Sequence, residues 1–386
     1  MDFALSEEMQ LISDTVRNFV TRELYPHEDL VDRLDDVPAE LAAQIRSRAI
    51  AAGLYAANMP AEHGGGGLGP VAMAVIDREL GRTGWGLNVY VARPSNILRA
   101  CKGDQVSRYL LPTIRGERTD CLAMTEPSAG SDVRSMRTRA VRDGNDYVIN
   151  GVKHFISHAD VADYVILFAV TGAEDTPRGP RNAISAFLVD KGTPGFTITR
   201  GPSCVSHRGY HQCELRFADC RVSAGQLLGQ AGTGFAMMGE WLSSTRIQVA
   251  ATCVGRARRM LELATEWAGT RQQFGQVIGK FQGVSFQLAD MAVEIEAADL
   301  LTMRSAWKLE KGLPCEQDIA MAKLYGSEML ARVTDRAVQI FGGSGLMQGT
   351  PVERAWRDAR VERIWDGTSE VQRHILSRAL LRKSEA

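Results

Sequence analysis

Apolar residues near the start of the chain recur with the period of an α-helix. Leu5, Met9, Ile12 and Val16 are spaced by three and four residues, which places them on one face of an amphipathic helix. Helical spacing continues to about residue 120. We therefore predict an N-terminal α-helical domain over residues 1–120.

The next segment, residues 121–232, has a different pattern. Short runs rich in β-branched and aromatic residues are separated by Gly, Pro, Asp and Asn, as in strands joined by turns. One of these runs ends in "ING", at Ile149–Gly151, and we expect a hairpin turn there. The segment is predicted to be a middle, β-barrel-like domain inserted between helical blocks.

Helical spacing returns in residues 233–386, in three long stretches. The first would form one helix of roughly nine turns, at about 3.6 residues per turn. Long antiparallel helices joined by short loops are typical of a four-helix bundle. The predicted fold is therefore mostly α with a central β domain, and its C-terminal part is an α-helical bundle.

Composition and charge narrow the class of protein. The 386 residues carry a formal net charge of -1, which gives no general attraction to nucleic acid or anionic membranes. No stretch is long and apolar enough to span a bilayer, and the N-terminus does not resemble a leader. Seven scattered cysteines without a C-x-x-C pair fit reduced, mostly buried thiols, and His154, His158 and His211 lack metal-ligand spacing. We expect a cytoplasmic protein that holds no metal.

Two polar motifs in the middle segment are candidates for ligand contact. In "AMTEPSAGSD", from Ala123 to Asp132, hydroxyls and free backbone N–H groups suit an anionic or heteroaromatic ligand. A plain polar turn leading into the sheet is the alternative. In "KHFIS", Phe155 and Ser157 are two residues apart and share one face of a strand. They suit a stacked ring with a hydrogen bond to its edge, or else a core Phe with a satisfied Ser.

Two further motifs lie in the C-terminal segment. "TRQQFG" carries Arg271 and Phe274 at the end of a helical run, and "QIFGGSG" places Gln339 ahead of Gly342 and Gly343. Adjacent glycines allow positive φ or the close approach of another backbone. They also suit a helix C-terminus, and both interpretations can hold together.

The fifth motif, "DGTSEVQR", starts at Asp366, and the five motifs in this order resemble those of the acyl-CoA dehydrogenase family. The helical–β–helical layout agrees, and the resemblance covers essentially the whole chain. One departure is Gly349, where an acid or amide is usual. The resemblance implies FAD as cofactor and an acyl-CoA substrate that is oxidised between Cα and Cβ. It also implies an electron-transferring flavoprotein as partner, a role in fatty acid or short-chain acid catabolism, and a homotetramer built as a dimer of dimers.

The resemblance also assigns cofactor contacts position by position. Four residues would contact the flavin ring and its ribityl or phosphate region, four would reach the FAD of a neighbouring subunit, and one would lie beside the pyrophosphate. In that order they are Thr125, Ser131, Phe155 (where Trp is usual) and Ser157 (where Thr is usual); Arg271, Phe274, Gln339 and Gly343; and Thr368.

The catalytic base implied by the resemblance is Asp366, although Glu is the common residue at this position. Asp is one methylene shorter, roughly 1.3–1.5 Å of reach, and a misplacement near 1 Å can cost about 10²-fold in rate. The alternative base position of the family, on the long helix, corresponds to Thr245, which cannot serve. The other interpretation of Asp366 is a helix N-cap, a role that Thr368 or Ser369 fills equally well.

Two arginines are candidates for substrate binding. Arg93 precedes Pro94 in an otherwise apolar segment that lines the far end of the acyl pocket in the family. A buried Arg there would pair with a terminal carboxylate or similar group on the acyl chain, whereas a surface or helix-end Arg is the alternative. Arg246, on the long helix, resembles a family arginine near the mouth of the pocket.

Two other functions remain open at the level of sequence. Nitroalkane oxidases resemble this family, use an aspartate base and reoxidise with oxygen, and an Asp base also occurs among alicyclic acyl-CoA dehydrogenases. A non-catalytic flavin-binding homologue is the third possibility. The leading hypothesis is a dehydrogenase for a short or unusual acyl group.

Overall fold

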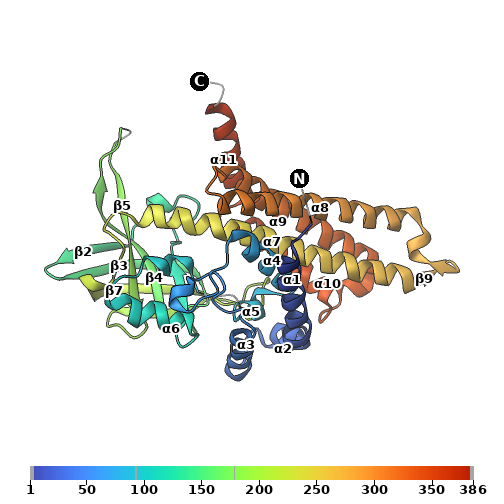
Figure 1. Cartoon of the computed structure of the whole chain (residues 1–386), viewed down its shortest axis with the longest axis horizontal. Coiled ribbons are helices and arrows are strands. Elements are labelled where there is room, and N and C mark those ends of the chain that lie inside the picture. Colours follow the sequence, from blue (N-terminus) through green and yellow to red (C-terminus); the bar gives the residue numbers. More distant parts are fainter. Residues whose placement is uncertain (1–3, 92–93, 178, 383–386) are drawn as a thin grey trace.

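The N-terminal part of the molecule is helical, and a computed structural model describes the chain at residues 4–91, 94–177 and 179–382 (Figure 1). The first helix begins after Ser6, whose hydroxyl accepts a hydrogen bond from the backbone N–H of Met9 and so caps it. The helices here are α1 (Glu7–Phe19), α2 (Glu28–Leu34), α3 (Ala39–Ala51), α4 (Pro70–Leu80), α5 (Trp85–Asn88) and α6 (Leu111–Ile114).

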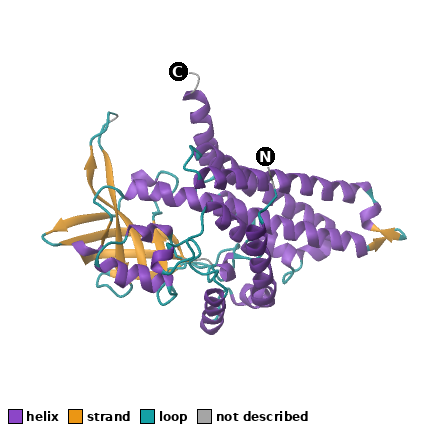
Figure 2. Cartoon of the chain, viewed as in Figure 1, coloured by secondary structure: helices purple, strands orange, loops and turns teal. Residues whose placement is uncertain are grey.

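The middle part is an eight-stranded sheet, in which β1 pairs in parallel with β4 and the other strands follow the order β6-β7-β3-β2-β4-β5-β8. Figure 2 shows these strands gathered at one end of the molecule, where only the first part of the long helix α7 reaches them. The strands are β1 (Asp120–Ala123), β2 (Arg139–Asp143), β3 (Asp146–Ser157), β4 (Tyr164–Glu174), β5 (Arg181–Asp190), β6 (Phe196–Arg200), β7 (Gln212–Ser223) and β8 (Leu227–Leu228).

The hairpin turn expected at Ile149–Gly151 is wrong. The turn between β2 and β3 lies earlier, and Asn150 and Gly151 sit inside β3 at a shift of register against β7. A Cβ on Gly151 would lie 2.4 Å from Oγ1 of Thr138, so the glycine serves close packing. The side chain of Asn150 donates to Asp219 on β7 at 3.1 Å, which is a cross-strand role.

The C-terminal part is a helical bundle, and with it the predicted mostly α fold with a central β domain is confirmed. The first helix has 37 residues, about ten turns rather than the expected nine. The elements are α7 (Gly234–Thr270), α8 (Gln282–Glu310), α9 (Glu316–Phe341), α10 (Pro351–Asp358) and α11 (Ser369–Arg382), with the small hairpin β9 (Gln272–Gln273) and β10 (Gln276–Val277) between α7 and α8.

Helix α7 holds the three parts together. It starts beside β5 of the sheet and ends at the β9–β10 hairpin, at the opposite end of the molecule (Figure 1). Helix α4 packs closely across it, because a Cβ on Gly255 would lie 1.7 Å from the carbonyl oxygen of Arg78. This close crossing docks the N-terminal helices against the bundle, next to the segment that carries Asp366.

The structure bears on three features considered in the sequence: membrane-spanning helices, metal-binding clusters and the state of the cysteines. Within the described ranges, no helix is long and apolar enough to cross a membrane. Among the same residues, no cluster of three or more His, Cys, Asp or Glu is arranged to hold a metal ion. The seven cysteines are free thiols, and five of them are buried, whereas Cys204 and Cys315 are partly exposed.

Candidate active site

The segment around Asp366 is a tight turn between the end of α10 and the start of α11. Asp366 and Gly367 both have positive φ, 53° and 94°. The hydroxyl of Thr368 accepts a hydrogen bond from the backbone N–H of Val371 at 3.2 Å, so Thr368 caps α11. The alternative interpretation of Asp366 as the helix N-cap is therefore wrong, and its carboxylate is left for another role.

Side chains from three helices hold this turn by its carbonyl oxygens. Arg246 on α7 donates from Nε to the Asp366 carbonyl at 3.0 Å. Lys323 on α9 and Gln372 on α11 donate to the Gly367 carbonyl at 2.8 and 2.9 Å. A side chain at position 367 would be strained at this φ, and its Cβ would lie 2.7 Å from Nε2 of Gln372. These hydrogen bonds hold the turn in place and sustain the left-handed backbone of Asp366, which is unfavourable for a residue other than glycine.

The Asp366 carboxyl group has the properties of a base. Burial raises its pKa to about 6, and the nearby charge of Glu362 adds to this rise, while Lys323 and Arg246 oppose it. No side chain in the described part of the molecule donates a hydrogen bond to this carboxylate. A carboxylate with a raised pKa and no donor is ionised at neutral pH and accepts a proton more readily than an ordinary Asp.

The two polar motifs of the middle part lie together. The backbone N–H of His154 donates to the carbonyl oxygen of Thr125 at 2.9 Å. Beneath them, the buried ammonium of Lys153 bonds the carbonyl oxygen of Met124 and a carboxylate oxygen of Glu126, both at 2.9 Å. Burial lowers the pKa of Lys153 to about 8, against the effect of Glu126. The pair joins the loop of Thr125 to strand β3.

Phe155 lies at the outer surface of this assembly rather than in the core. Its side chain is 63% exposed and its φ is 55°, at the irregular stretch of β3 that faces β7. Ser157 is partly exposed and its hydroxyl donates to Gln212 at 3.0 Å, while Ile156 between the two is buried. Ser131 is exposed in the preceding loop. An exposed aromatic ring is a surface on which a planar ligand can stack.

The other cofactor candidates lie at the far end of the bundle. Arg271 ends α7, and Phe274 is 92% exposed in the hairpin that follows. Trp267 and Phe341 stack at 4.8 Å, which places the end of α9, with the exposed Gln339 and Gly343, at the same end. Gly342 ends α9 with a φ of 62°, as expected for a helix C-terminus.

One chain does not bring the two groups of cofactor candidates together. Helix α7 separates them, and at about 1.5 Å per residue it is roughly 55 Å long. Of the substrate candidates, Arg93 lies outside the described residues. Arg246 is adjacent to Asp366 through the hydrogen bond to its carbonyl oxygen.

Several residues around the site were not predicted. Lys323 is fully buried on α9. Its position in "IAMAKLYGSEML", a cation within an apolar helical run, was a usable signal. Glu126 and Lys153 stand inside the recognised motifs, yet nothing in their spacing indicated that they pair. His207 and Glu362 come from distant segments and carried no signal in the sequence.

The candidate site therefore offers a carboxylate of raised pKa, Asp366, beside the helical bundle, and an exposed aromatic ring, Phe155, on the β domain. Family models for the N-terminal, middle and C-terminal domains of acyl-CoA dehydrogenases match residues 6–117, 121–220 and 232–381. The chain belongs to the acyl-CoA dehydrogenase family. It is an enzyme and a flavoprotein, with FAD as its cofactor.

Relatives and solved structures are similar over nearly the full length. The cyclohex-1-ene-1-carbonyl-CoA dehydrogenase of Geobacter metallireducens is 39% identical over 383 residues, which covers 98% of this chain and 99% of that protein. Butyryl-CoA dehydrogenase from Megasphaera elsdenii has a TM-score of 0.89 at 34% identity, over 99% and 100% of the two chains. A structure of the electron transferring flavoprotein of Acidaminococcus fermentans contains a chain with a TM-score of 0.91 at 35% identity, over 99% and 100%.

The residues present fit FAD. The exposed Phe155 ring suits stacking with a flat heteroaromatic ring, and the Ser157 hydroxyl two residues further on suits a polar contact. At the end of the bundle that carries the β9–β10 hairpin, three exposed residues could contact a ligand. Arg271 offers a cation, Phe274 an aromatic ring and Gly343 an uncovered backbone. Such groups suit a phosphate and a nucleobase.

Proposed function

We propose that this protein oxidises an acyl-CoA thioester to the 2,3-enoyl-CoA, with Asp366 as the base that removes the α-proton. The observation that carries the proposal is the Asp366 carboxylate. It has a pKa of about 6, has no hydrogen-bond donor among the described residues, and sits on a turn fixed by three helices. Its place in the fifth family motif supports the same role.

The chemistry needs a base of this kind because the α-C–H of a thioester is a weak acid. Asp366 takes the α-proton and becomes a neutral acid, a change that its burial favours. FAD, when bound, would supply the two-electron acceptor for the hydride that leaves Cβ. Thr125, Ser131, Phe155, Ser157 and Thr368 would hold that cofactor within one chain.

We propose a short or cyclic acyl group as substrate. Asp366 is shorter than Glu by roughly 1.5 Å, so the α-carbon must lie closer to the turn. A compact acyl group allows this approach. The relatives named as cyclohex-1-ene-1-carbonyl-CoA and butyryl-CoA dehydrogenases support a cyclic or a short acyl group, respectively.

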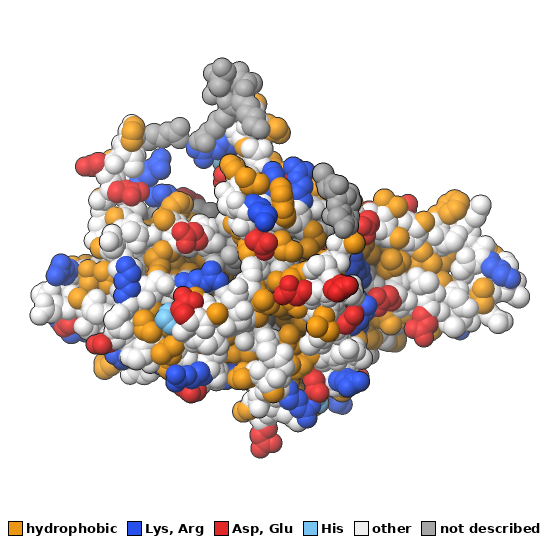
Figure 3. All heavy atoms as spheres, viewed as in Figure 1, with side chains coloured by type: hydrophobic (Ala, Val, Ile, Leu, Met, Phe, Trp, Pro, Cys, Tyr) orange, Lys and Arg blue, Asp and Glu red, His pale blue; other side chains and the backbone are white. Residues whose placement is uncertain are grey.

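A homo-oligomer is part of the proposal, and the family resemblance implies a tetramer. Arg271, Phe274, Gln339 and Gly343 cannot reach the cofactor surface of their own chain, so a second chain would complete the site. Figure 3 shows apolar side chains on the surface of the arm that Figure 1 labels α8. An exposed stripe of apolar residues spaced by seven runs along α8, as in helices that pack on one another. It consists of Phe286, Val293, Leu300 and Trp307.

The proposed electron acceptor is an electron-transferring flavoprotein, which the similarity to a chain in the structure of such a flavoprotein supports. The test is anaerobic mixing of the purified protein with a panel of acyl-CoAs, including dicarboxylic and alicyclic ones, followed by an electron-transferring flavoprotein. Loss of the flavin absorbance with an acyl-CoA, and its return on adding the acceptor, is the expected result. Prompt oxygen consumption with a nitroalkane and no CoA ester would favour the oxidase instead. Bound flavin that no substrate reduces would favour a non-catalytic protein.

A further inference from the structure

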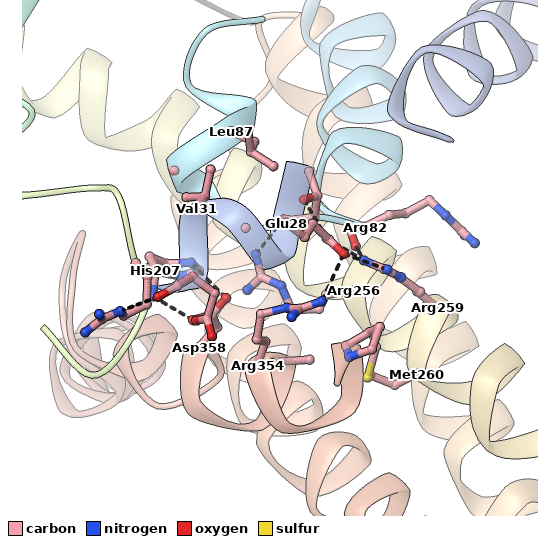
Figure 4. A pocket seen from close by; sticks show the side chains of 17 residues that line it. Glu28, Val31, Arg82, Leu87, His207, Arg256, Arg259, Met260, Arg354 and Asp358 are labelled. Carbon is pink, nitrogen blue, oxygen red and sulfur yellow. Dashed lines mark hydrogen bonds and ion pairs between the residues drawn. The ribbon is translucent and has the colours of Figure 1, made fainter. Parts of the chain in front are cut away.

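Four charged side chains form a buried cluster behind the turn of Asp366, and we name it the charge cluster: His207, Arg256, Asp358 and Glu362. Glu362 is fully buried and accepts from Arg256 at 2.8 Å and from Nε2 of His207 at 3.1 Å. Nδ1 of His207 lies 3.3 Å from Asp358. Figure 4 shows His207, Asp358 and Arg256 together at the wall of a small cavity.

The charge cluster joins all three parts of the molecule. His207 comes from the loop between β6 and β7, Arg256 from α7, and Asp358 from the end of α10. Arg256 also donates to the carbonyl oxygen of Thr83 in the N-terminal part at 3.1 Å. Burial alone would lower the pKa of His207, but the charge of Asp358 and the hydrogen bonds with Asp358 and Glu362 together raise it.

Trp365, the neighbour of the base, is held by this cluster. Its indole N–H donates to Glu362 at 2.8 Å. Its ring stacks on His207 at 5.2 Å with an interplanar angle of 6°, and meets the edge of Trp85 at 5.8 Å. A hydrogen bond, a stacking contact and an edge contact thus fix one indole, directly before the positive-φ backbone of Asp366.

We propose that Glu362 and His207 are positioning residues, which hold Trp365 and through it fix the Asp366 carboxylate for proton transfer. The inference rests on the proposed role of Asp366 as the base. A shorter base tolerates less error in placement, because misplacement near 1 Å costs about 10²-fold in rate. Arg246, Lys323 and Gln372 fix the backbone carbonyl oxygens of the turn. The contacts of the Trp365 indole restrict the remaining rotation of the chain next to Asp366.

The cluster also sets the charge around the base. The charged groups that face Asp366 are Lys323 from α9, Arg246 from α7 and Glu362 from the turn after α10. Glu362 in turn faces His207 and Arg256. Replacing Glu362 by Gln removes a negative charge and leaves those cations less compensated. Both effects favour the carboxylate form of Asp366, so its pKa falls.

The test uses Glu362→Gln and Trp365→Phe in the FAD-loaded protein, with anaerobic flavin reduction measured by stopped flow at saturating acyl-CoA from pH 5 to 9. Asp318→Asn is the matched control, since Asp318 is a buried carboxylate paired with Lys308 and Arg304 elsewhere in the bundle. For E362Q we expect the acid limb, the part of the pH–rate profile where the rate of flavin reduction falls at low pH, to move to lower pH. The plateau rate of that profile should fall about tenfold. For W365F we expect a similar loss with the acid limb nearly unchanged. D318N should lower Tm alone.

The inference is overturned if W365F and E362Q lower Tm as D318N does, yet keep the rate and the acid limb of the unaltered protein. If E362Q does not fold, W365F decides alone by its rate at saturating substrate. Asp366→Asn tests the proposed base separately from the positioning role of Glu362 and His207. Reduction that survives in D366N sinks the proposed base, whereas an inactive D366N beside unaffected W365F and E362Q sinks only the positioning role.

Discussion

The ammonium nitrogen of Lys323 lies 2.8 Å from the carbonyl oxygen of Gly367, one residue beyond Asp366. Lys323 is fully buried, and burial lowers its pKa although the charge of Asp366 acts in the opposite direction. A single side chain on α9 therefore does two things. It holds the turn of Asp366 by a carbonyl oxygen, and it places a positive charge beside the Asp366 carboxylate.

Replacing Lys323 by Met should move the pH dependence of flavin reduction to higher pH. The cation lowers the pKa of Asp366, so its loss raises that pKa above about 6, and less carboxylate is present at pH 7. The acid limb of the rate should shift upward, opposite to the shift expected for E362Q. Stopped-flow reduction from pH 5 to 9 measures it, with Lys308→Met as control, because Lys308 pairs with Asp318 instead. An unmoved acid limb in K323M would contradict the charge assignment.

The buried pair of Lys153 and Glu126 should control FAD retention. Removing one partner of a buried ion pair costs roughly 3–5 kcal/mol, because the other charge stays buried and unpaired. We expect K153M to lower Tm and release FAD on gel filtration. The double variant K153M/E126Q should regain part of the Tm, since no lone charge remains. The ratio of flavin to protein absorbance is the readout, and full FAD occupancy in both variants would count against this role.

The apolar stripe on α8 should hold copies of the chain together. Val293 is 70% exposed within it, so a Glu at this position would place a charge in the proposed interface. Sedimentation velocity of V293E should show a smaller particle, and FAD should be lost on dilution. Val141→Glu is the matched control, at a 62% exposed valine of β2. Identical sedimentation of V293E and the unaltered protein would place the interface elsewhere.

Asp77 should limit stability at alkaline pH. Burial raises its pKa to about 7, with only a hydrogen bond from Gln248 in opposition. A raised carboxyl pKa in the folded state gives stability that is complete below the unfolded pKa and is lost as pH rises through about 7. D77N avoids that loss and should stabilise by roughly 2–4 kcal/mol at pH 8, with a gain that shrinks toward pH 4. Chemical unfolding at both pH values measures it, with the exposed Asp335→Asn as control. A constant difference across pH would refute the titration of Asp77.

The general fold could be predicted because periodicity is local. The spacing of Leu5, Met9, Ile12 and Val16 was enough to predict a helix in this region. The turn expected at Asn150–Gly151 failed because such a dipeptide also fits within a strand. There Thr138 approaches too closely for any Cβ, and a neighbour of that kind is invisible in the sequence.

The candidate site also contains residues that the sequence could predict and others that only the folded chain reveals. Asp366 and the cofactor candidates lie in contiguous motifs, which a linear sequence is enough to identify. His207 joins Asp358 and Glu362 across 151 and 155 residues of chain, and only the folded chain shows that these charges are buried together. The pKa of Asp366 depends on that same burial and on Lys323 from another helix, which no local pattern indicates.

The central claim is that Asp366 is the base, and the most direct measurement is anaerobic flavin reduction by Asp366→Asn. Asn is close in volume but cannot take the α-proton, so FAD binding and Tm should be retained. The account predicts that the best acyl-CoA of the panel reduces the flavin of the unaltered protein. In D366N the rate should be at least about 10³-fold lower, in keeping with the usual contribution of a general base. Reduction of D366N at a rate near that of the unaltered protein would contradict the account.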